Sequence, residues 1–198
     1  MLTDGPRTPI SAGMIEDIQL LDHHTRPAPV KLKGLTDGQR AAGLHLKEVH
    51  NHLRENMLTL GRLIERAAGR GGSAAELTAE ASTLAMVSNY RRFGNLCGQH
   101  CQIVNLHHSI EDDAVFPSIA AQGPAFKAIA DRLRAEHVVV HTLLVRLITA
   151  LGALANQPGP EPFDDAVTVY RALERVLLSH LGYEEEAIGD ALGYFQLF

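Results

Sequence analysis

The chain contains the stretch HHSIEDDAVFP, residues 107–117, in which two histidines and three acidic residues occupy seven positions before an apolar run. On an α-helix, residues four apart lie on the same face, so His107 and Glu111 would point the same way, one turn apart. Imidazole nitrogen suits iron, zinc and copper, and a carboxylate can bridge two ions. A solvent-exposed helix face often shows the same pair. The rest of the sequence must therefore decide between a metal-binding pair and an exposed helix face.

Around this stretch, long segments rich in Ala, Leu, Glu and Arg alternate with short Gly- and Pro-containing loops, which favours helices. The second helix is expected to pass through Phe116-Pro117 and to end at the turn Gln122-Gly123-Pro124. Short loops make sequential helices antiparallel neighbours, so the sequence predicts an all-α, up-down-up-down four-helix bundle. The predicted helices are Asp37–Gly69, about 75–115 with a kink at Gly94, Pro124–Asn156, and about 162–194.

Residues 1–36 form a separate segment in this prediction. Its four prolines favour an irregular N-terminal arm, in which residues 14–21 are expected to form a short helix. The pair His23-His24 is expected to lie in an exposed loop. The predicted organisation is therefore an arm over residues 1–36 and a bundle over residues 37–198.

The composition narrows the class of protein. The chain has 198 residues and a formal net charge of −5, and Arg91-Arg92 is its only basic doublet. A nucleic-acid binder should show a basic stripe, so nucleic acid is not an expected partner. No signal sequence is visible in residues 1–20 and two cysteines make no disulfide framework, which predicts a reducing cytoplasm. The apolar run 138–155 is broken by His141 and Arg146, so we expect a buried helix and no membrane span. The sequence leaves the oligomeric state open.

Each predicted helix carries histidine on its apolar face. Two neutral imidazoles at His137 and His141, on one buried face, are costly unless both find partners, which favours a metal. The spacing of His180 and Glu184 repeats that of His107 and Glu111. In a four-helix bundle the apolar faces converge, so these donors should meet in the core. The predicted inward set is His50, His107, Glu111, His137, His141, His180 and Glu184.

The number and kind of these donors narrow the choice of metal. Structural zinc takes four ligands, and calcium or magnesium prefers oxygen, so neither accounts for five imidazoles and two carboxylates. Two transition ions that share two bridging carboxylates fit the set and leave one position open for a small ligand. Nitrogen-rich ligation suits iron, although affinity alone does not exclude manganese or zinc. The ferritin-like carboxylate bundle requires Glu-x-x-His on two helices, and this sequence contains none.

The chain resembles the hemerythrin family, specifically the bacterial hemerythrin-like domains with the HHE cation-binding pattern. The resemblance covers about residues 37–196 and rests on four motifs in order: Val49-His50-Asn51-His52-Leu53-Arg54, HHSIEDDAVFP from His107, Glu136-His137-Val138-Val139-Val140-His141, and His180-Leu181-Gly182-Tyr183-Glu184-Glu185. It implies a four-helix bundle with two iron ions, bridged by an oxo or hydroxo group and two carboxylates. In this resemblance His50, His107, His137, His141 and His180 match the terminal ligands, and Glu111 matches one bridge.

The second bridge has two candidates. Oxygen-carrying hemerythrins have a His-x4-Asp pattern that points to Glu185, whereas many HHE domains have His-x3-Glu, which points to Glu184. Helical facing favours Glu184, because it lies closer to the line of His180. Tyr183, between His180 and Glu184, is a candidate phenol donor or iron ligand.

The cysteines near the motifs, and His108, each allow more than one interpretation. Cys97 and Cys101, with His100, would form a second soft metal site, or the two thiols are simply reduced core residues. His108 is expected on the flank of its helix, as a solvated group or one that orients a ligand.

Two functional hypotheses follow from the resemblance. The first is redox chemistry with a small oxidant, such as hydrogen peroxide, nitric oxide or oxygen, at the open iron position; this would make the protein a catalase-like or nitric-oxide-consuming enzyme. The second is an iron or oxygen sensing or binding module without turnover, with the N-terminal arm as the only candidate output segment. The alternative to both is a metal-free bundle with satisfied core histidines.

Overall fold

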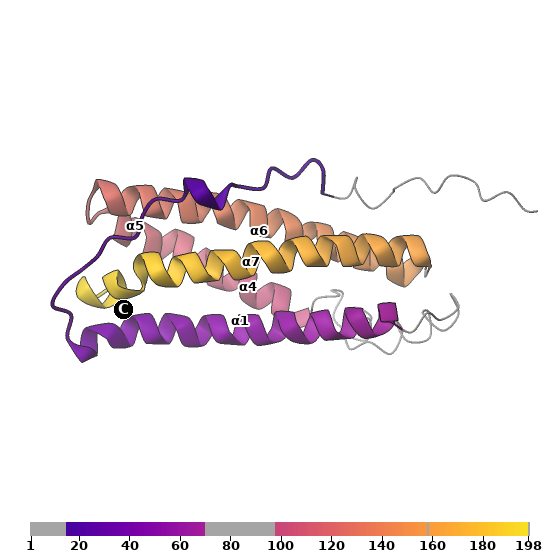
Figure 1. Ribbon diagram of the computed structural model, residues 1–198, viewed down its shortest axis with the longest axis horizontal. Coiled ribbons are helices and arrows are strands. Elements are labelled where there is room, and N and C mark those ends of the chain that lie inside the picture. Colours follow the sequence, from indigo (N-terminus) through magenta and orange to yellow (C-terminus); the bar gives the residue numbers. More distant parts are fainter. Residues whose placement is uncertain (1–14, 70–97, 158, 198) are drawn as a thin grey trace, which may run out of the picture.

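The computed structural model describes residues 15–69, 98–157 and 159–197, with the backbone alone for residues 63–69, 98–103 and 155. Its helices run side by side along one axis and alternate in direction (Figure 1). The predicted all-α, up-down-up-down bundle is confirmed, and the described residues contain no β-strand. The helical elements are η1 (His23–Thr25), α1 (Asp37–Gly69), α4 (Gly98–Ile110), η2 (Glu111–Val115), α5 (Phe116–Ala120), α6 (Pro124–Asn156) and α7 (Pro160–Tyr194).

The ends of the helices follow the local sequence. Helices α1 and α6 have the predicted bounds. Helix α7 begins at Pro160, two residues before the predicted start, because Gly159 is extended and its carbonyl already accepts a hydrogen bond from the N–H of Phe163. Proline at this position suits a helix start, since its missing N–H has no partner within the helix. The predicted start near Ala75 and the kink at Gly94 lie outside the described residues.

The second helix contains a break that the sequence did not predict. Residues Glu111–Val115 form a π-helical turn, η2, in which the N–H of Phe116 bonds to the carbonyl of Glu111, five residues back. Pro117 follows directly and has no N–H to donate, which removes one α-helical bond that would compete with this turn. The extra residue lets Glu111, Val115 and Phe116 all be buried. The helix then continues to Ala120, and as predicted it ends before Gly123, which has a φ of 137°.

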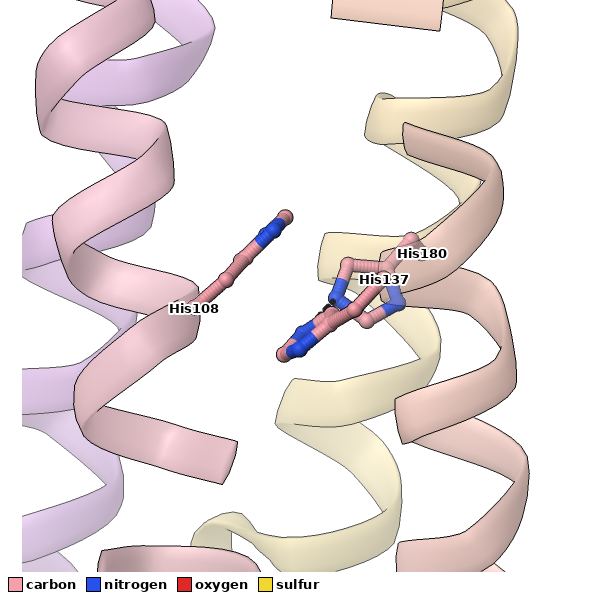
Figure 2. A group of neighbouring side chains, drawn as sticks. All are labelled: His108, His137 and His180. Atoms are coloured by element: carbon pink, nitrogen blue, oxygen red, sulfur yellow. Dashed lines mark hydrogen bonds between the residues drawn. The ribbon is translucent and has the colours of Figure 1, made fainter. Parts of the chain in front are cut away.

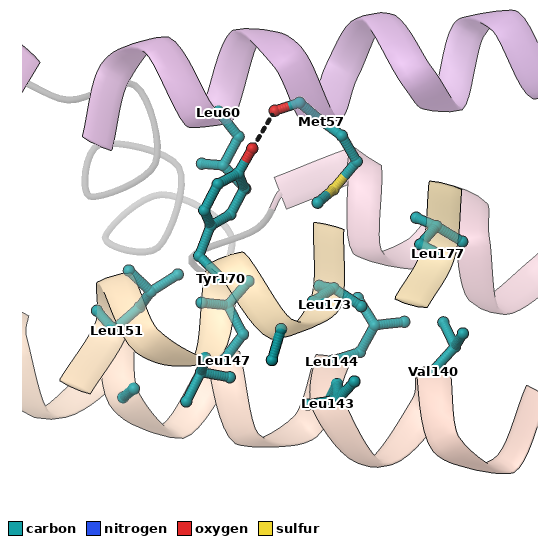
Figure 3. Close-up of a cluster of buried hydrophobic side chains, with 14 of the residues drawn as sticks. Met57, Leu60, Val140, Leu143, Leu144, Leu147, Leu151, Tyr170, Leu173 and Leu177 are labelled. Atoms are coloured by element: carbon teal, nitrogen blue, oxygen red, sulfur yellow. Dashed lines mark hydrogen bonds between the residues drawn. The ribbon is translucent and has the colours of Figure 1, made fainter. Parts of the chain in front are cut away.

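Two apolar clusters fill the bundle. One cluster surrounds Tyr170, whose hydroxyl donates to the carbonyl of Met57 at 2.7 Å; it contains Leu residues of α6 and α7 (Figure 3). The other cluster surrounds Phe116 and contains Leu46, Ile129 and Ile188. On α1, Leu46 and Leu53 belong to different clusters, and His50 lies between them. The buried polar residues of the bundle therefore lie in a layer between two apolar ones.

Helices α1 and α7 approach closely through small residues. A Cβ on Gly193 would collide with the carbonyl of Gln39, and one on Gly43 would lie 2.8 Å from the carbonyl oxygen of Gly189. No side chain fits at these contacts without moving one helix away from the other. The glycines therefore set the distance between the helix that carries His50 and the helix that carries His180.

The arm packs along α6 and α7. The predicted helix over residues 14–21 is not formed: Ile15 begins a turn closed by a hydrogen bond from the N–H of Ile18, and the side chain of Ile18 joins the apolar cluster around Tyr170. The Asp22 side chain then caps η1, in which His23 and His24 are exposed, as predicted.

Helix α6 is long and apolar enough to cross a membrane, by length and composition alone. Half of its most apolar window is buried inside the bundle, and the core helix of a soluble protein passes the same test. The side chains of Leu143 and Leu147, near the centre of this helix, are fully buried against the other helices.

Candidate metal centre

The polar layer between the two apolar clusters contains seven buried or nearly buried histidine and glutamate side chains. They come from all four helices of the bundle, with α4 and η2 belonging to the same one, so no single helix forms the site. The seven residues are His50 on α1, His107 and His108 on α4, Glu111 on η2, His137 on α6, and His180 and Glu184 on α7.

The first half of the layer is formed by His50 and His107. Their Nε2 atoms face each other at 3.1 Å. The Oε1 atom of Glu111 lies 3.1 Å from Nε2 of His107, and the Oε2 atom of Glu184 lies 3.8 Å from Nε2 of His50. Two imidazoles and two carboxylates thus direct one donor atom each toward a common point.

The second half repeats this arrangement with His137 and His180. Their Nε2 atoms also lie 3.1 Å apart. The other oxygen of Glu111, Oε2, lies 3.6 Å from Nε2 of His137, and Oε2 of Glu184 lies 3.3 Å from Nε2 of His180. Each carboxylate therefore reaches both halves, which is the placement that a bridging ligand requires.

The opposite ring nitrogens of three histidines each face a carboxylate. Nδ1 of His50 lies 3.0 Å from Glu185, Nδ1 of His137 lies 3.1 Å from Asp112, and Nδ1 of His180 lies 3.1 Å from Glu136. An ionised carboxylate only accepts hydrogen bonds, so each Nδ1 carries the proton and donates it. The Nε2 atom of each neutral ring then presents a lone pair, in the orientation typical of metal-ligating histidines.

This tautomer has a direct consequence in the second half. When both His137 and His180 are neutral and protonated on Nδ1, their two Nε2 lone pairs face each other at 3.1 Å. Two lone pairs at that distance repel unless a cation lies between them. The pair therefore has room for one positive charge, which is either a proton on His180, whose pKa is raised, or a metal ion.

The protonation states of the histidines also suit a cation. Burial lowers the pKa of His107 to about 4 and the pKa of His137 to about 2, and it lowers the pKa of His50 and His108 as well. These rings are neutral at pH 7 and have a nitrogen free for a metal. Burial lowers the pKa of His180, but the negative charges of the nearby Glu136 and Glu184 outweigh burial, so the pKa is raised.

The two carboxylates lack hydrogen-bond donors. Oε2 of Glu111 and both carboxylate oxygens of Glu184 are buried and accept no hydrogen bond from the residues that the structure describes. Burial raises the pKa of Glu111 well above its usual range, and the Glu184 carboxylate raises it further. Glu111 therefore stays protonated beside Glu184 at pH 7 unless a cation offsets the two negative charges. The donor set thus fits a pair of transition ions.

A family model of the hemerythrin HHE cation-binding domain matches residues 44–192. The chain belongs to the hemerythrin HHE cation-binding family. The resemblance noted in the sequence is thereby confirmed. No curated protein and no solved structure matches the chain significantly. The layer of histidines and glutamates accordingly lies in a cation-binding HHE domain, and its two sets of clustered donors are able to hold metal.

Most of the predicted ligands of the HHE domain come together in the layer, and one does not. His141 is half-buried on α6, with its ring 5.4 Å from that of His108, and it belongs to neither cluster of donor atoms. It lines an open groove of about 460 Å³, together with Asp112, His137, Val138, Thr142, Val145 and Arg146. This groove leads from the surface to the His137 side of the layer.

The structure distinguishes the two candidates for the second bridge by position. Glu184 is fully buried and faces Nε2 of His50 and of His180. Glu185 lies on the outer side of His50, where one carboxylate oxygen contacts Nδ1 of His50 at 3.0 Å and the guanidinium of Arg54 at 2.6 Å. Glu185 is therefore placed to orient His50, and Glu184 is placed between the two halves.

His108 is not on the flank of its helix. Its side chain has an exposed fraction of 0% and lies in the layer, stacked on His137 (Figure 2). Neighbouring residues of an α-helix point about 100° apart, so His107 faces α1 while His108 faces α6 and α7. The buried positions Val104, His108 and Glu111 already have helical spacing in the sequence. The prediction was wrong because it admitted only one inward direction for a helix with neighbours on two sides.

Tyr183 points to the arm. Its hydroxyl donates to the carbonyl of Pro27 at 2.9 Å, and the guanidinium of Arg26 lies 4.7 Å from its ring centre. Burial raises its pKa to about 12, so the phenol remains protonated at pH 7. The side chains of Cys97, His100 and Cys101, proposed as a second soft site, lie outside the described residues.

The carboxylates that orient the histidines were not identified from the sequence. Asp112 and Glu136 adjoin predicted ligands, and this adjacency was the only available signal. Glu136 is held in turn by Arg26 and Arg132, at 2.8 and 2.7 Å. Burial alone would raise the pKa of Glu136. Hydrogen bonds from His180, Arg26 and Arg132 outweigh burial and lower this pKa to about 2. Arg26 is 110 positions away and gave no signal.

Proposed function

We propose that this HHE domain binds two iron ions and reacts with a small oxidant, such as hydrogen peroxide, nitric oxide or oxygen. In this proposal His50 and His107 hold one ion, His137 and His180 hold the other, and Glu111 and Glu184 bridge the two. The cytoplasmic location predicted from the sequence is part of the proposal.

One observation carries this proposal. The Nε2 atoms of His137 and His180 face each other at 3.1 Å while both Nδ1 atoms lie against carboxylates. In their neutral forms, two such rings offer both lone pairs to a cation that lies between them. Imidazole-rich sites of this kind suit iron among the redox-active metals, whereas calcium and magnesium prefer oxygen ligands.

The groove beside His137 supports access by a small molecule. Its walls combine the apolar Val138 and Val145 with Thr142 and His141. The groove, at about 460 Å³, is large enough to admit a molecule the size of peroxide or nitric oxide as far as His137. Bound iron would supply Lewis acidity and electron exchange toward that molecule. The residues of the chain hold the ions, orient the rings through Asp112 and Glu136, and shield the layer between two apolar clusters.

The test is metal analysis followed by turnover. Freshly purified full-length protein should contain about two iron ions per chain, as the proposed ligand set requires. The iron-loaded protein should consume peroxide or nitric oxide, and His137→Ala should lose most of this rate along with iron. Less than one equivalent of iron in a fully folded protein contradicts the metal centre. Equal rates in wild type and His137→Ala contradict the catalytic proposal but not metal binding.

A second candidate function is an iron or oxygen sensor without turnover, and one observation favours it. The arm is tied to the metal centre, because Arg26 bonds to Glu136, which bonds to Nδ1 of His180. A change at His180 would then alter the hold on the arm. Limited proteolysis of full-length protein, with and without iron, tests this: the arm should be cut faster in the iron-free form. Equal cleavage in both forms contradicts the sensor.

A further inference from the structure

His108 is a buried side chain whose two ring nitrogens have no partner. Neither Nδ1 nor Nε2 makes a hydrogen bond to any residue that the structure describes, and the ring has an exposed fraction of 0%. A neutral imidazole has one donor and one acceptor, and burying both without partners is unfavourable. Leucine or phenylalanine would fill the same space in the core at lower cost. The presence of a histidine here therefore needs a reason other than packing.

The neighbours of His108 supply that reason. Its ring is stacked on that of His137, with ring centres 3.7 Å apart and planes 10° from parallel, and it meets the ring of His180 edge-on at 5.4 Å. Figure 2 shows the three rings gathered between α4, α6 and α7. One ring nitrogen from each of His108, His137 and His180 lies within 4.8 Å of the others. That spacing brings the three nitrogens within reach of one ion once the His108 ring turns out of its stack on His137, because an imidazole binds a metal in its own plane.

His141, which the sequence prediction included among the metal ligands, is placed differently. Its ring touches the edge of His108 rather than the faces of His137 and His180, and it forms part of the wall of the open groove. It is half-buried, whereas His108 is fully enclosed. The ring of His108 thus contacts His141 as well as both members of the His137–His180 pair.

We propose that His108 is the third imidazole ligand of the ion held by His137 and His180, and that His141 is a residue of the entrance groove. This inference rests on the proposed two-iron centre and changes its ligand set. In this arrangement the adjacent residues His107 and His108 bind different ions, one on each side of α4. His141 then contacts the incoming molecule before it reaches the layer.

Two matched variants of the full-length protein test the proposal, His108→Phe and His141→Phe. Each keeps an aromatic ring and removes both nitrogens. His108→Phe should bind one of its two irons about tenfold or more weakly, as expected when a metal site loses a donor. Its Mössbauer spectrum should lose the signal of that iron. His141→Phe should keep two irons per chain and the wild-type spectrum.

The iron-free proteins provide a second readout. Because the His108 nitrogens have no partner among the described residues, iron-free His108→Phe and His108→Leu should melt at or above the wild-type temperature. On iron loading, the melting temperature of both variants should rise by less than that of the wild type. Iron-free variants that fail to fold would show that the ring has a structural role, and would overturn the proposal. Two irons with wild-type spectra in His108→Phe would also overturn it, while leaving the two-iron centre intact. If wild-type protein itself binds no iron, the proposed function and this inference both fail.

Discussion

The two halves of the metal centre each have a facing pair of imidazoles and reach the same two carboxylates, but they differ in the residues that support them. In the first half, Glu185 and Arg54 orient His50, and the Glu185 side chain is 17% exposed. In the second half, Glu136 orients His180, is 4% exposed, and is held by both Arg26 and Arg132. The first half thus draws its support from α1 and α7, whereas the second draws part of its support from the N-terminal arm.

This difference shows how support for a site extends beyond the domain that defines it. The family match covers residues 44–192, and Arg26 lies before it. Arg132 also reaches back to the arm, bonding to the hydroxyl of Thr25 and the carbonyl of Asp22. The ligands belong to the family pattern, but the residues that hold the second half rigid belong partly to a segment that this pattern does not include.

Removing iron should have the largest effect, since it unpairs both halves together. A ligand present at a thousand times its dissociation constant stabilises the folded state by about 4 kcal/mol. For a chain of this size that corresponds to about 10 °C in melting temperature. Calorimetry of iron-loaded and chelator-treated protein measures it, and equal melting temperatures would show that the layer does not depend on a cation.

Glu136→Gln should have the next largest effect, confined to the second half. The neutral amide forms a weaker hydrogen bond with the Nδ1–H of His180 than the charged carboxylate does. It also carries no negative charge to pair with Arg26 and Arg132. We expect a loss of about 2 kcal/mol in the iron-free protein and a 10- to 100-fold weaker affinity for one iron. Denaturant unfolding and metal titration measure the two effects.

Glu185→Gln is the matched variant for the first half. The Glu185 side chain is more exposed than that of Glu136 and pairs with a single arginine. We therefore expect a smaller loss of unfolding free energy, about 1 kcal/mol, in the iron-free protein. A loss equal to that of Glu136→Gln would remove the asymmetry between the halves.

Arg26→Ala should weaken only the link to the arm, because Arg132 continues to hold Glu136. We expect a loss of about 1 kcal/mol in denaturant unfolding. The arm should also be cut faster by a protease, and Arg54→Ala should leave arm cleavage unchanged. Cleavage rates that match wild type would show that the arm is held by its other contacts.

Tyr183→Phe removes the hydrogen bond to the carbonyl of Pro27 and leaves the ring in place. The expected loss is about 0.5 kcal/mol, typical of one partly exposed hydrogen bond. Iron content and spectrum should be those of the wild type, because the hydroxyl faces the arm. A changed iron spectrum would restore the prediction that Tyr183 tunes the metal.

Asp17→Asn should have the smallest effect. Asp17 pairs with Arg146 at 2.7 Å, but its side chain is 65% exposed, and such pairs contribute little. We expect an unchanged melting temperature and unchanged arm cleavage. A clear loss in either would place the main anchor of the arm at Asp17 rather than at Arg26.

Much of the centre was predictable from periodicity. The apolar stripe of each helix includes the histidine or glutamate that faces inward, so six of the predicted donors converge: His50, His107, Glu111, His137, His180 and Glu184. Gly, Pro and Asp at the loops marked the helix ends, and α1 and α6 begin and end where predicted. These features depend on local geometry that each segment carries by itself.

The remaining features depend on how the segments pack. The inward direction of His108 follows from the position of α4 between two neighbours, and the π-helical turn at Glu111–Val115 joins a local cause, the missing N–H of Pro117, to the burial of Glu111, Val115 and Phe116. Helical spacing states which residues share a face, but the rotation of one helix against another is decided by side-chain packing.

By itself the sequence determined the all-α fold, most of the helix bounds and the identity of most donors, because these follow from a repeat of 3.6 residues and from turn-forming residues. Only the tertiary structure decided which carboxylate orients which ring, including the role of Glu185 behind His50, and that the arm reaches Glu136 through Arg26. Such contacts join residues up to 110 positions apart, and no local pattern encodes a contact between segments that meet only on folding.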